Sequence, residues 1–556
     1  MLRPIFTFGP PSDIWPKPAF SAAATLAALN LMLFATGHLD LALYTSAGGM
    51  GVLYGHGLPY RTRARVLTGV LLGMVASTAV ALTASALTTS TAVLVVVAAA
   101  LAAVQRMLCD AARVGPPGAL IMTFVTASCA FVPQRLSEVP AHVALALGGA
   151  AAAYVVCMAP ALVRADGPER IAVARALEAA ARVARLRESA GTDSAATAAG
   201  HEAAARVAEQ RESAGTRSAA TTDSAATAAG HEAAARHGLA ALVGAARVAL
   251  GQASATRAST RQLARLLVHA EAALGTGPDS TATAADRYLA QARAVRAGRP
   301  IPEVVLSRAE EREADALRHS APAWWHALRP GSEIMPIGMR VLVGCAVAGW
   351  VSAAFGVGRP YWAIVTAASV FQVSAGLSWH RALHRVVGNF TGLALFTALL
   401  PVSRSGAVAL IVLAALCQIA AEATIARSYW IASTFVTPMA LFMVEFAGHH
   451  PAHTLIADRW LDTLVGAVFG LGACYAVTNR RSALRLERAL ARVRGATGGA
   501  AHRELAAALV ELRTARDTAG NEWRQRPLPH AEVAEAEQHG HRVLADLVGQ
   551  RVAEPV

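Results

Sequence analysis

Twelve apolar runs dominate this sequence, and each has close to the 17–25 residues that a helix needs to cross a bilayer. Inside a bilayer, every backbone polar group must be satisfied within the protein, and a helix does this by itself. We therefore predict an all-α membrane protein. The expected spans are 19–36, 39–56, 66–86, 91–105, 117–133 and 140–163, followed by 337–355, 360–376, 383–401, 406–424, 428–446 and 459–477.

The composition supports this class and excludes others. Of the 556 residues, 54% are hydrophobic and only 16% are charged, whereas soluble domains carry about 25% charged residues. An ordinary cytosolic enzyme and a disordered chain are excluded. The net charge of +13 is attributed to arginines that anchor the chain at a membrane, and no nucleic-acid partner is expected. The only lysine, Lys17, lies outside any phosphate-binding GxxxxGK[ST] loop, so we expect no ATPase activity.

The loops between the expected spans predict an orientation. With the N-terminus inside, eight arginines fall on inner loops and four on outer loops, as the positive-inside rule requires. The inner set is Arg61, Arg63, Arg65, Arg106, Arg113, Arg381, Arg385 and Arg427, and the outer set is Arg135, Arg359, Arg404 and Arg459. We expect a multi-pass protein of the plasma membrane with both termini in the cytoplasm.

Five segments follow from this reading. Two six-helix transmembrane halves are separated by a polar region in which apolar residues recur at helical spacing. We expect that region and the tail to be cytoplasmic helical parts that pack on one another. Within it, 181–236 holds an internal duplication, in which TDSAATAAGHEAAAR occurs twice without change, and we interpret it as an expandable hairpin tip. The segments are 1–18, 19–163, 164–330, 331–478 and 479–556.

Pairs of glycines four residues apart recur in the third, ninth and twelfth expected spans. Such pairs let two helices approach closely in a bilayer. The third and ninth spans occupy matching places in the two halves, and arginines precede both pairs, so we expect a parallel repeat. The expected packing residues are Gly69, Gly73, Gly388, Gly392, Gly466 and Gly470.

The second half carries a more specific pattern. GRPYWAIVTAASVFQVSAGLSWHRALHRVVGNFTGLAL and ADRWLDTLVGAVFG, within 336–478, resemble the signature motifs of the fusaric acid resistance (FUSC) proteins. The first half matches only in outline, and Asn389 stands where the family usually has threonine. The resemblance implies two membrane halves around a cytoplasmic helical region, as in aromatic acid exporters. It also implies efflux of small organic acids driven by the proton gradient.

Several residues are candidates for the substrate pathway, each with a structural alternative. Arg381, His384 and Arg385 share one helix face, and they either collect organic anions or anchor the span by snorkelling. Tyr361 and Trp362 open a span, and they either stack on an aromatic substrate or belong to the interfacial aromatic belt. Gln372 is expected to hydrogen-bond a neighbouring helix or a substrate.

Asp462 is the candidate for proton coupling, because a carboxylate inside a membrane is costly and needs a partner or a role. Arg459 three residues earlier, or a neighbouring helix, could pair with it. Glu422 and Glu445, near span ends, are weaker candidates for the same role. The histidines of HHPAH, His449, His450 and His453, lack completing ligands, and neither a metal nor another cofactor is expected.

Together these features indicate an efflux transporter for small, aromatic or other, organic acids and not an enzyme. The alternatives are a passive organic-anion channel gated by the cytoplasmic helices and a membrane scaffold that transports nothing. The expected partners are the lipid bilayer and a small organic anion. The sequence does not decide whether the chain forms a homo-oligomer.

Overall fold

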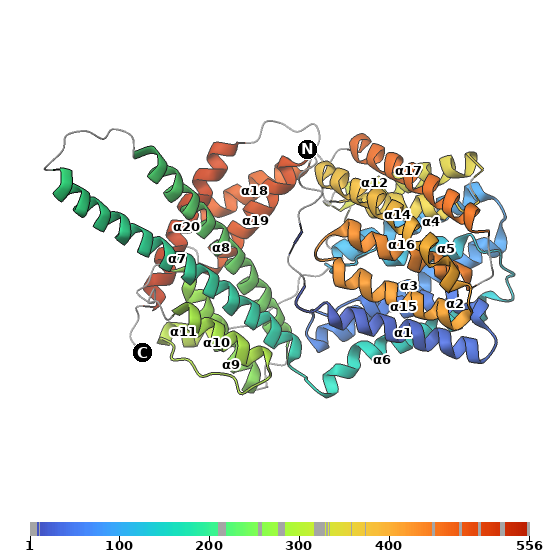
Figure 1. Cartoon of the computed structure of the whole chain (residues 1–556), viewed down its shortest axis with the longest axis horizontal. Coiled ribbons are helices and arrows are strands. Elements are labelled where there is room, and N and C mark those ends of the chain that lie inside the picture. The colour runs from blue at the N-terminus through green and yellow to red at the C-terminus, as the bar shows by residue number, and fades with distance from the viewer. Residues whose placement is uncertain are drawn as a thin grey trace.

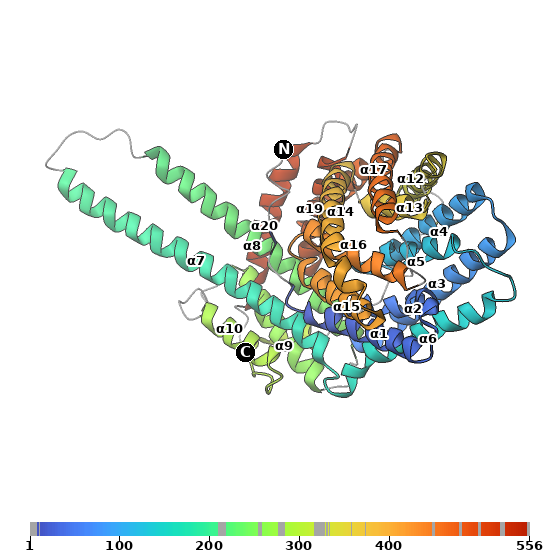
Figure 2. The ribbon, with the colours of Figure 1, turned by 45° about the vertical axis from the view of Figure 1, so that its right-hand side comes forward.

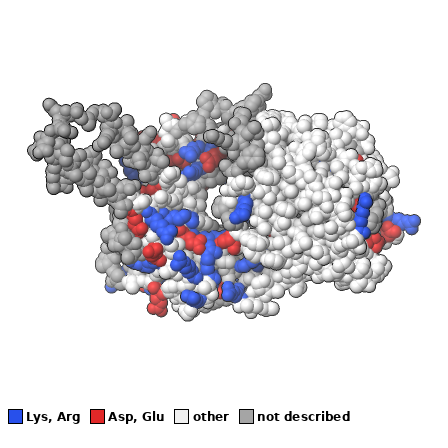
Figure 3. All heavy atoms as spheres, viewed as in Figure 1, with Lys and Arg blue, Asp and Glu red and all other residues white. Residues whose placement is uncertain are grey.

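The computed structural model is all-helical, with 20 α-helices and several short 3-10 turns among the residues it describes. A group of membrane-embedded helices, whose surface carries few charged side chains, lies beside a group of polar helices (Figures 1 and 3). The structure describes residues 8–9, 12–208, 218–253, 258–275, 284–315, 329, 332, 334–356, 358–372, 374–446, 451–477, 481–498, 502–522 and 529–552.

The membrane part consists of twelve helices in two groups of six. The second helix of each group, α2 or α13, is short. The first group is α1 (Pro16–Ala35), α2 (Ala42–Gly49), α3 (Tyr60–Leu87), α4 (Thr91–Ala111), α5 (Leu120–Ala130) and α6 (Val139–Met158). The second group is α12 (Met335–Ala354), α13 (Tyr361–Val370), α14 (Ala375–Ser403), α15 (Ala407–Thr424), α16 (Tyr429–Glu445) and α17 (Ala452–Ala476).

These twelve helices fall at the places of the twelve expected spans, although not all are long enough to cross a bilayer unaided. Seven described helices are long and apolar enough to do so, and two shorter apolar helices, α5 and α13, accompany them. The chain is a multi-pass membrane protein. The seven are Pro16–Ala35, Tyr60–Leu87, Thr91–Ala111, Val139–Leu162, Met335–Ala354, Ala375–Ser403 and Ala407–Thr424.

The remaining helices form a polar module that shares one hydrophobic core. The C-terminal helices pack into the same core as the central ones, as expected for the region and the tail. Figure 3 shows arginine and acidic side chains gathered on this module and nearly absent from the broad band beside it. The module consists of α7 (Gly167–Ala208), α8 (Ser218–Gln252), α9 (Ala258–Glu271), α10 (Ala284–Arg296), α11 (Arg308–Asp315), α18 (Arg481–Ala496), α19 (His502–Gly520) and α20 (His530–Val552).

The duplicated tract lies on the two long arms of a helical hairpin. The first copy of the repeated 15-residue segment, 192–206, belongs to α7, and the second, 222–236, belongs to α8. Figures 1 and 2 show the ends of both arms standing away from the rest of the module. At the base of the arms, Arg187 of α7 donates to Glu232 of α8 at 2.9 Å.

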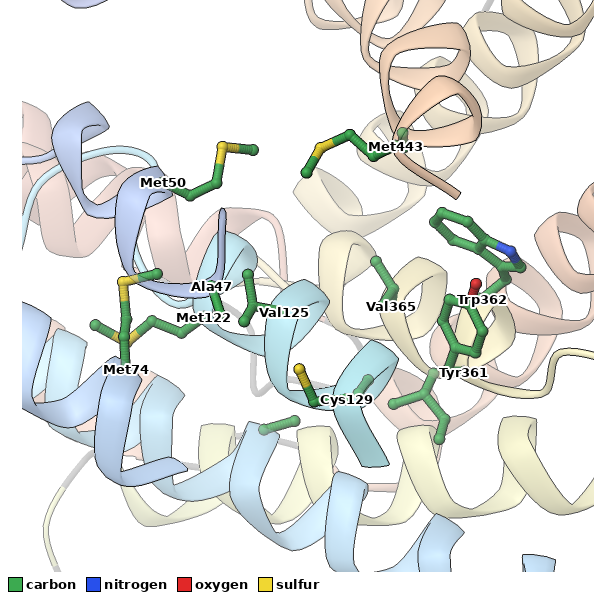
Figure 4. Close-up of a cluster of buried hydrophobic side chains, with 14 of the residues drawn as sticks. Ala47, Met50, Met74, Met122, Val125, Cys129, Tyr361, Trp362, Val365 and Met443 are labelled. Carbon is green, nitrogen blue, oxygen red and sulfur yellow. The ribbon is translucent and has the colours of Figure 1, made fainter. Parts of the chain in front are cut away.

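The two membrane groups are joined by reciprocal helix contacts. The first helix of each packs on the fourth helix of the other: α1 lies against α15, and α12 lies against α4. Between these contacts, Met50, Met74 and Met122 of the first group lie in one apolar cluster with Val365 and Met443 of the second (Figure 4). Close packing of flexible methionines and small residues fills this central contact.

Ion pairs connect the polar module to the membrane part at one end of the spans. Asp13, just before α1, accepts hydrogen bonds from Arg175 of α7 at 2.5 Å and Arg296 of α10 at 2.7 Å. Arg340 in the first two turns of α12 donates to Glu522, which follows α19, at 2.5 Å. The segment before α1, the module and the C-terminal helices therefore lie at the same end of the spans.

The glycine pairs differ in what they contact. A Cβ at Gly388 would lie 2.5 Å from the Trp430 carbonyl oxygen of α16, and one at Gly466 would lie 2.5 Å from the Ala363 carbonyl oxygen of α13. A Cβ at Gly392 would lie 2.7 Å from the nearest atom of α16, and one at Gly470 would lie 3.1 Å from the nearest atom of α13. By contrast, a Cβ at Gly69 or Gly73 would meet nothing within 4 Å. The prediction that these two glycines pack closely against another helix is therefore wrong within this chain.

In the first group, close approach occurs instead between α2 and α6. A Cβ at Gly48 would lie 1.9 Å from the Ala146 carbonyl oxygen, and one at Gly149 would lie 2.0 Å from the Thr45 carbonyl oxygen. This pair of helices corresponds in order to α13 and α17 in the second group. The close contact of the first group is therefore made by α2 and α6 and not by the glycines of α3.

Candidate functional site

The site begins at a break in the backbone of the second group. Helix α13 has only 10 residues and ends at Val370, inside the run that the sequence predicted to span 360–376. Arg106 of α4 donates its Nη1 to the Phe371 carbonyl oxygen at 3.1 Å, which satisfies an acceptor that the helix end leaves open. Gln372 lies in this break and not inside the span. Its side chain donates to the same carbonyl oxygen at 2.9 Å.

Two arginines of α14 lie beside the break and face α16. The Arg381 guanidinium stacks on the Tyr429 ring, with its carbon 3.2 Å from the ring centroid. Arg385, one turn further, is only 3% exposed. Both were expected on an inner loop, but α14 begins at Ala375 and carries them inside the helix bundle. A snorkelling arginine would point out of the protein toward the interface, and Arg385 does not.

A third arginine, Arg459, lies on α17, the last helix of the second group. Arg459 was expected on an outer loop, but α17 begins at Ala452, so Arg459 lies two turns inside the helix and is 1% exposed. Its guanidinium carbon lies 3.8 Å from the centroid of the Trp362 ring of α13. Arg459 is also close enough to Arg385 for the two positive charges to repel each other.

The tyrosine and tryptophan that open α13 are buried at the contact between the two groups. Tyr361 is 7% exposed and Trp362 is 1% exposed. Trp362 stacks on Phe124 of α5 with 5.6 Å between ring centroids, and Tyr361 lies 6.2 Å from Phe131. Both therefore line the interior, whereas residues of an interfacial aromatic belt face headgroups.

Asp462 is fully buried and takes its partner from a neighbouring helix. Its Oδ1 accepts a hydrogen bond from the Ser352 hydroxyl of α12 at 2.5 Å. No described donor reaches Oδ2. From the sequence, either Arg459 or a neighbouring helix could pair with Asp462, and the structure shows the neighbouring helix. Arg459 lies on the Trp362 ring instead, and it forms no ion pair with Asp462 among the described contacts.

A polar bridge joins α14, α16 and α17 between the arginines. Asn389 donates to the Thr463 hydroxyl at 2.6 Å and accepts from the Thr437 hydroxyl at 2.5 Å. Asn389 replaces the threonine usual in the resembled family, and its two-sided amide satisfies both neighbours. The bridge fixes how the three helices that carry the arginines sit against one another.

The other predicted residues are two glutamates near helix ends, His384 beside the two arginines of α14, and the histidines of HHPAH. Half-buried Glu422 on α15 accepts from Gln418 of its own helix at 3.3 Å, and half-buried Glu445 ends α16. His384 is half-buried and shows no partner for its Nε2 in the described part of the chain. His453 is exposed, whereas His449 and His450 lie outside the described residues.

Tyr429 was not predicted from the sequence. A signal was present: Tyr429–Trp430 opens α16 with the same residue pair that opens α13. Only the packing of α14 on α16 shows that Tyr429 holds Arg381.

The charges of the cluster do not balance. Arg381, Arg385 and Arg459 contribute three positive charges, and Asp462 contributes at most one negative charge. Nε of Arg385, and Nε and Nη1 of Arg459, have no hydrogen-bond acceptor among the described residues. Buried guanidinium groups without acceptors cost several kcal/mol, roughly 3–5 kcal/mol when one partner of a pair is missing. The arrangement is suited to binding a carboxylate, which accepts from a guanidinium in a bidentate manner.

Comparisons with known proteins identify this region. Residues 346–473 match the family described as fusaric acid resistance protein-like. The chain is also 32% identical to the uncharacterized membrane protein YvaC of Bacillus subtilis, over 36% of this chain and 34% of that protein. The chain thus covers about a third of that relative's length. No solved structure matches the chain. The resemblance inferred from the motifs is confirmed, and residues 346–473, which carry the whole arginine cluster, form a fusaric acid resistance protein-like region.

Proposed function

We propose that this protein exports small organic anions, including aromatic acids, across the plasma membrane by using the proton gradient. The observation that supports this most is the excess of buried positive charge around Arg385 and Arg459, whose Nε atoms have no acceptor among the described residues. A bound carboxylate would supply the missing negative charge and acceptors. Fusaric acid resistance-like proteins are generally transporters and not enzymes, which agrees with this function.

The surroundings of the arginines favour an aromatic or otherwise apolar substituent on the anion. Tyr429 and Trp362 each present one ring face to a guanidinium, and the Phe124 ring lies beside Trp362. An aromatic acid could stack among these rings while its carboxylate meets the arginines. Because Arg385 and Arg459 are buried, the substrate reaches them only when the helices rearrange.

Broken helices support the same location. Transporters bind substrates where helices are interrupted, because the exposed backbone groups then line a protected site. Here α13 stops after 10 residues beside Arg106 and Arg381, and the equivalent helix of the first group, α2, has only 8 residues. This supports a pathway at the contact between the two groups.

Asp462 is the residue that we assign to proton coupling. It is fully buried, its Oδ2 has no described donor, and it lies on the same helix as Arg459. Gain or loss of its proton would change the net charge next to the arginines, so the protonation state of Asp462 would be linked to binding and release of the anion.

The decisive experiment measures uptake of a labelled aromatic carboxylate into liposomes that contain the full chain, with and without a pH gradient. Arg385→Gln and Arg459→Gln should each lower transport at least tenfold, because one guanidinium–carboxylate interaction contributes roughly 1.5–3 kcal/mol. Arg385→Lys should recover part of the loss, since lysine keeps the charge but not the fork. Arg404→Gln, an exposed arginine after α14, is the matched control.

The outcomes separate the alternatives. Transport by the Gln variants at the wild-type rate and affinity would refute the site. Flux that follows the membrane potential and ignores the pH gradient would make the protein a passive channel. An Asp462→Asn variant that keeps transport but loses its dependence on the pH gradient would support coupling at Asp462. No flux of any carboxylate would leave a scaffold as the function.

We further propose that the two groups of six helices are parallel repeats. The reciprocal contacts of α1 with α15 and of α12 with α4 support this, as does the equivalent packing of α2 on α6 and α13 on α17. In an experimental structure, the two groups should superpose by a rotation about the membrane normal. A rotation about an axis in the membrane plane would contradict the proposal.

The orientation that we propose places both termini and the polar module in the cytoplasm. Its support is the arginine distribution and the attachment of Asp13 to the module. A cysteine at Ala447 should react with an impermeant reagent added outside intact cells, and one at Ser194 should not. The six native cysteines are buried, so their background labelling should be low. The reverse pattern would overturn the orientation.

A further inference from the structure

A pocket of about 450 Å³ lies where the first membrane group meets the polar module. Its walls come from the start of α3, the end of α6, the turn Ala159–Leu162 that follows α6, and the start of α7. None of the transport residues discussed above lines it. The lining residues are Tyr60, Arg61, Ala64, Arg65, Met158, Ala161, Ala165, Glu169 and Ala253.

Two exposed arginines of this pocket are available for a ligand. Arg61 and Arg65 lie one turn apart on α3, and neither forms a hydrogen bond or ion pair through its side chain within the described part of the chain. The one carboxylate of the lining, Glu169, is 4% exposed and acts electrostatically on the buried Arg63. Glu169 forms no described ion pair with Arg61 or Arg65, and the two arginines outnumber it, so the lining of the pocket carries a net positive charge.

The face of α3 below these arginines is open and apolar. Arg61, Arg65, Gly69 and Gly73 follow one another at four-residue intervals, so they lie along one stripe of the helix. A Cβ at either glycine would meet nothing within 4 Å, and Leu72 beside them is 57% exposed. The stripe thus leads from two cations at the end of the span into the apolar band.

The turn after α6 provides a second sign of contact with the membrane surface. Leu162 is 91% exposed and Val163 is 85% exposed, next to the exposed Arg164. Large apolar side chains beside a cation are typical of segments that lie at the boundary between acyl chains and headgroups. This turn contributes Ala161 to the pocket wall, so the pocket lies directly beside these exposed apolar side chains.

We propose that this pocket binds one anionic phospholipid from the leaflet on the side of the polar module. The phosphate would be held by Arg61 and Arg65, and one acyl chain would lie over Gly69 and Gly73. A phospholipid fits better than a soluble phosphate, because the cations continue directly into an apolar path that faces the bilayer. Basic pockets at the ends of membrane helices commonly bind anionic headgroups. The bound lipid would join α3 and α6 to the start of α7.

The test is native mass spectrometry of the purified full chain titrated with phosphatidylglycerol. The wild type should retain one phosphatidylglycerol with preference over phosphatidylcholine, and Arg61→Gln/Arg65→Gln should bind it about tenfold more weakly. Arg61→Lys/Arg65→Lys should be intermediate. Arg287→Gln/Arg293→Gln, which removes two exposed charges from α10, should bind like the wild type.

A second variant examines the acyl path. Gly69→Phe should weaken binding of long-chain phosphatidylglycerol without unfolding the protein, because open space faces that position. Equal binding by the wild type and the Arg61→Gln/Arg65→Gln variant would overturn the proposal. Displacement of the lipid by inorganic phosphate at similar concentration would also overturn it, since the site would then recognise a soluble anion.

Discussion

The buried ion pair between Arg340 and Glu522 gives the most quantitative prediction. Both side chains are fully buried, and the Nη2–Oε1 distance is 2.5 Å. Arg340 also donates its Nε to the Val477 carbonyl oxygen at 2.6 Å. The pair thereby connects the start of α12, the end of α17 and the residue that follows α19. Its loss should loosen the polar module from the membrane part.

The magnitude follows from what each variant leaves unpaired. Glu522→Leu leaves a buried guanidinium without its carboxylate and should cost about 3–5 kcal/mol in the free energy of unfolding. Arg340→Met should lower the free energy of unfolding by about 1 kcal/mol more than Glu522→Leu does, because it also removes the hydrogen bond to the Val477 carbonyl oxygen. Among the described partners of the pair, the double variant leaves that carbonyl oxygen unsatisfied, so it should cost about 1–3 kcal/mol.

A double-mutant cycle on the full chain measures this coupling. Unfolding by denaturant in detergent micelles can be followed by far-ultraviolet circular dichroism, with Arg404→Met as the exposed control. The double variant should be more stable than either single variant. Strictly additive losses would refute the reasoning, because they would mean that Arg340 and Glu522 stabilise the protein independently of their pairing.

Three further predictions concern other parts of the molecule. Burial lowers the pKa of His502, but hydrogen bonds to two buried carboxylates of α9 and α11 outweigh it and raise that pKa above its ordinary value. The stabilisation by protonated His502 is complete below about pH 6.5 and is lost as the pH rises through the raised pKa. The free energy of unfolding, measured from about pH 5.5 to 9, should therefore decline in the wild type and should decline less in His502→Gln. Identical pH profiles of the two proteins would contradict this. Gly466→Leu should prevent folding by clashing with Ala363, whereas Gly73→Leu should be tolerated, and equal yields of folded protein would refute the contrast. Deletion of 192–221 rejoins the duplicated segments in register and should leave expression and transport nearly unchanged; a folded but inactive product would show that the tract binds something essential.

The positions of the helices could be predicted from the sequence because they depend on local patterns. An apolar run of bilayer length favours a helix, and each of the twelve expected runs overlaps one, although α2 and α13 occupy only part of theirs. The polar helices follow in the same way from apolar residues at helical spacing. Helix ends were less certain: α17 begins seven residues before the predicted 459, because polar residues near a membrane surface continue a helix without an apolar signal.

The surroundings of individual side chains could not be predicted in this way. Gly69-xxx-Gly73 and Gly388-xxx-Gly392 are the same motif after the same kind of basic segment, yet one faces open space and the other packs against α16. The spacing places both glycines on one helix face, but it does not say which helix, if any, covers that face. That depends on contacts between segments far apart in the chain.

The same limit applies to the candidate site. Arg381, Arg385, Arg459 and Asp462 can be placed in or next to apolar spans from local pattern alone, and charges there are costly and therefore informative. The contact of Arg459 with Trp362, and the hydrogen bond of Asp462 with Ser352 of α12, follow only from how the helices pack. A side chain's partner is set by the packing of helices about 100 residues apart, and local spacing carries no information about that packing.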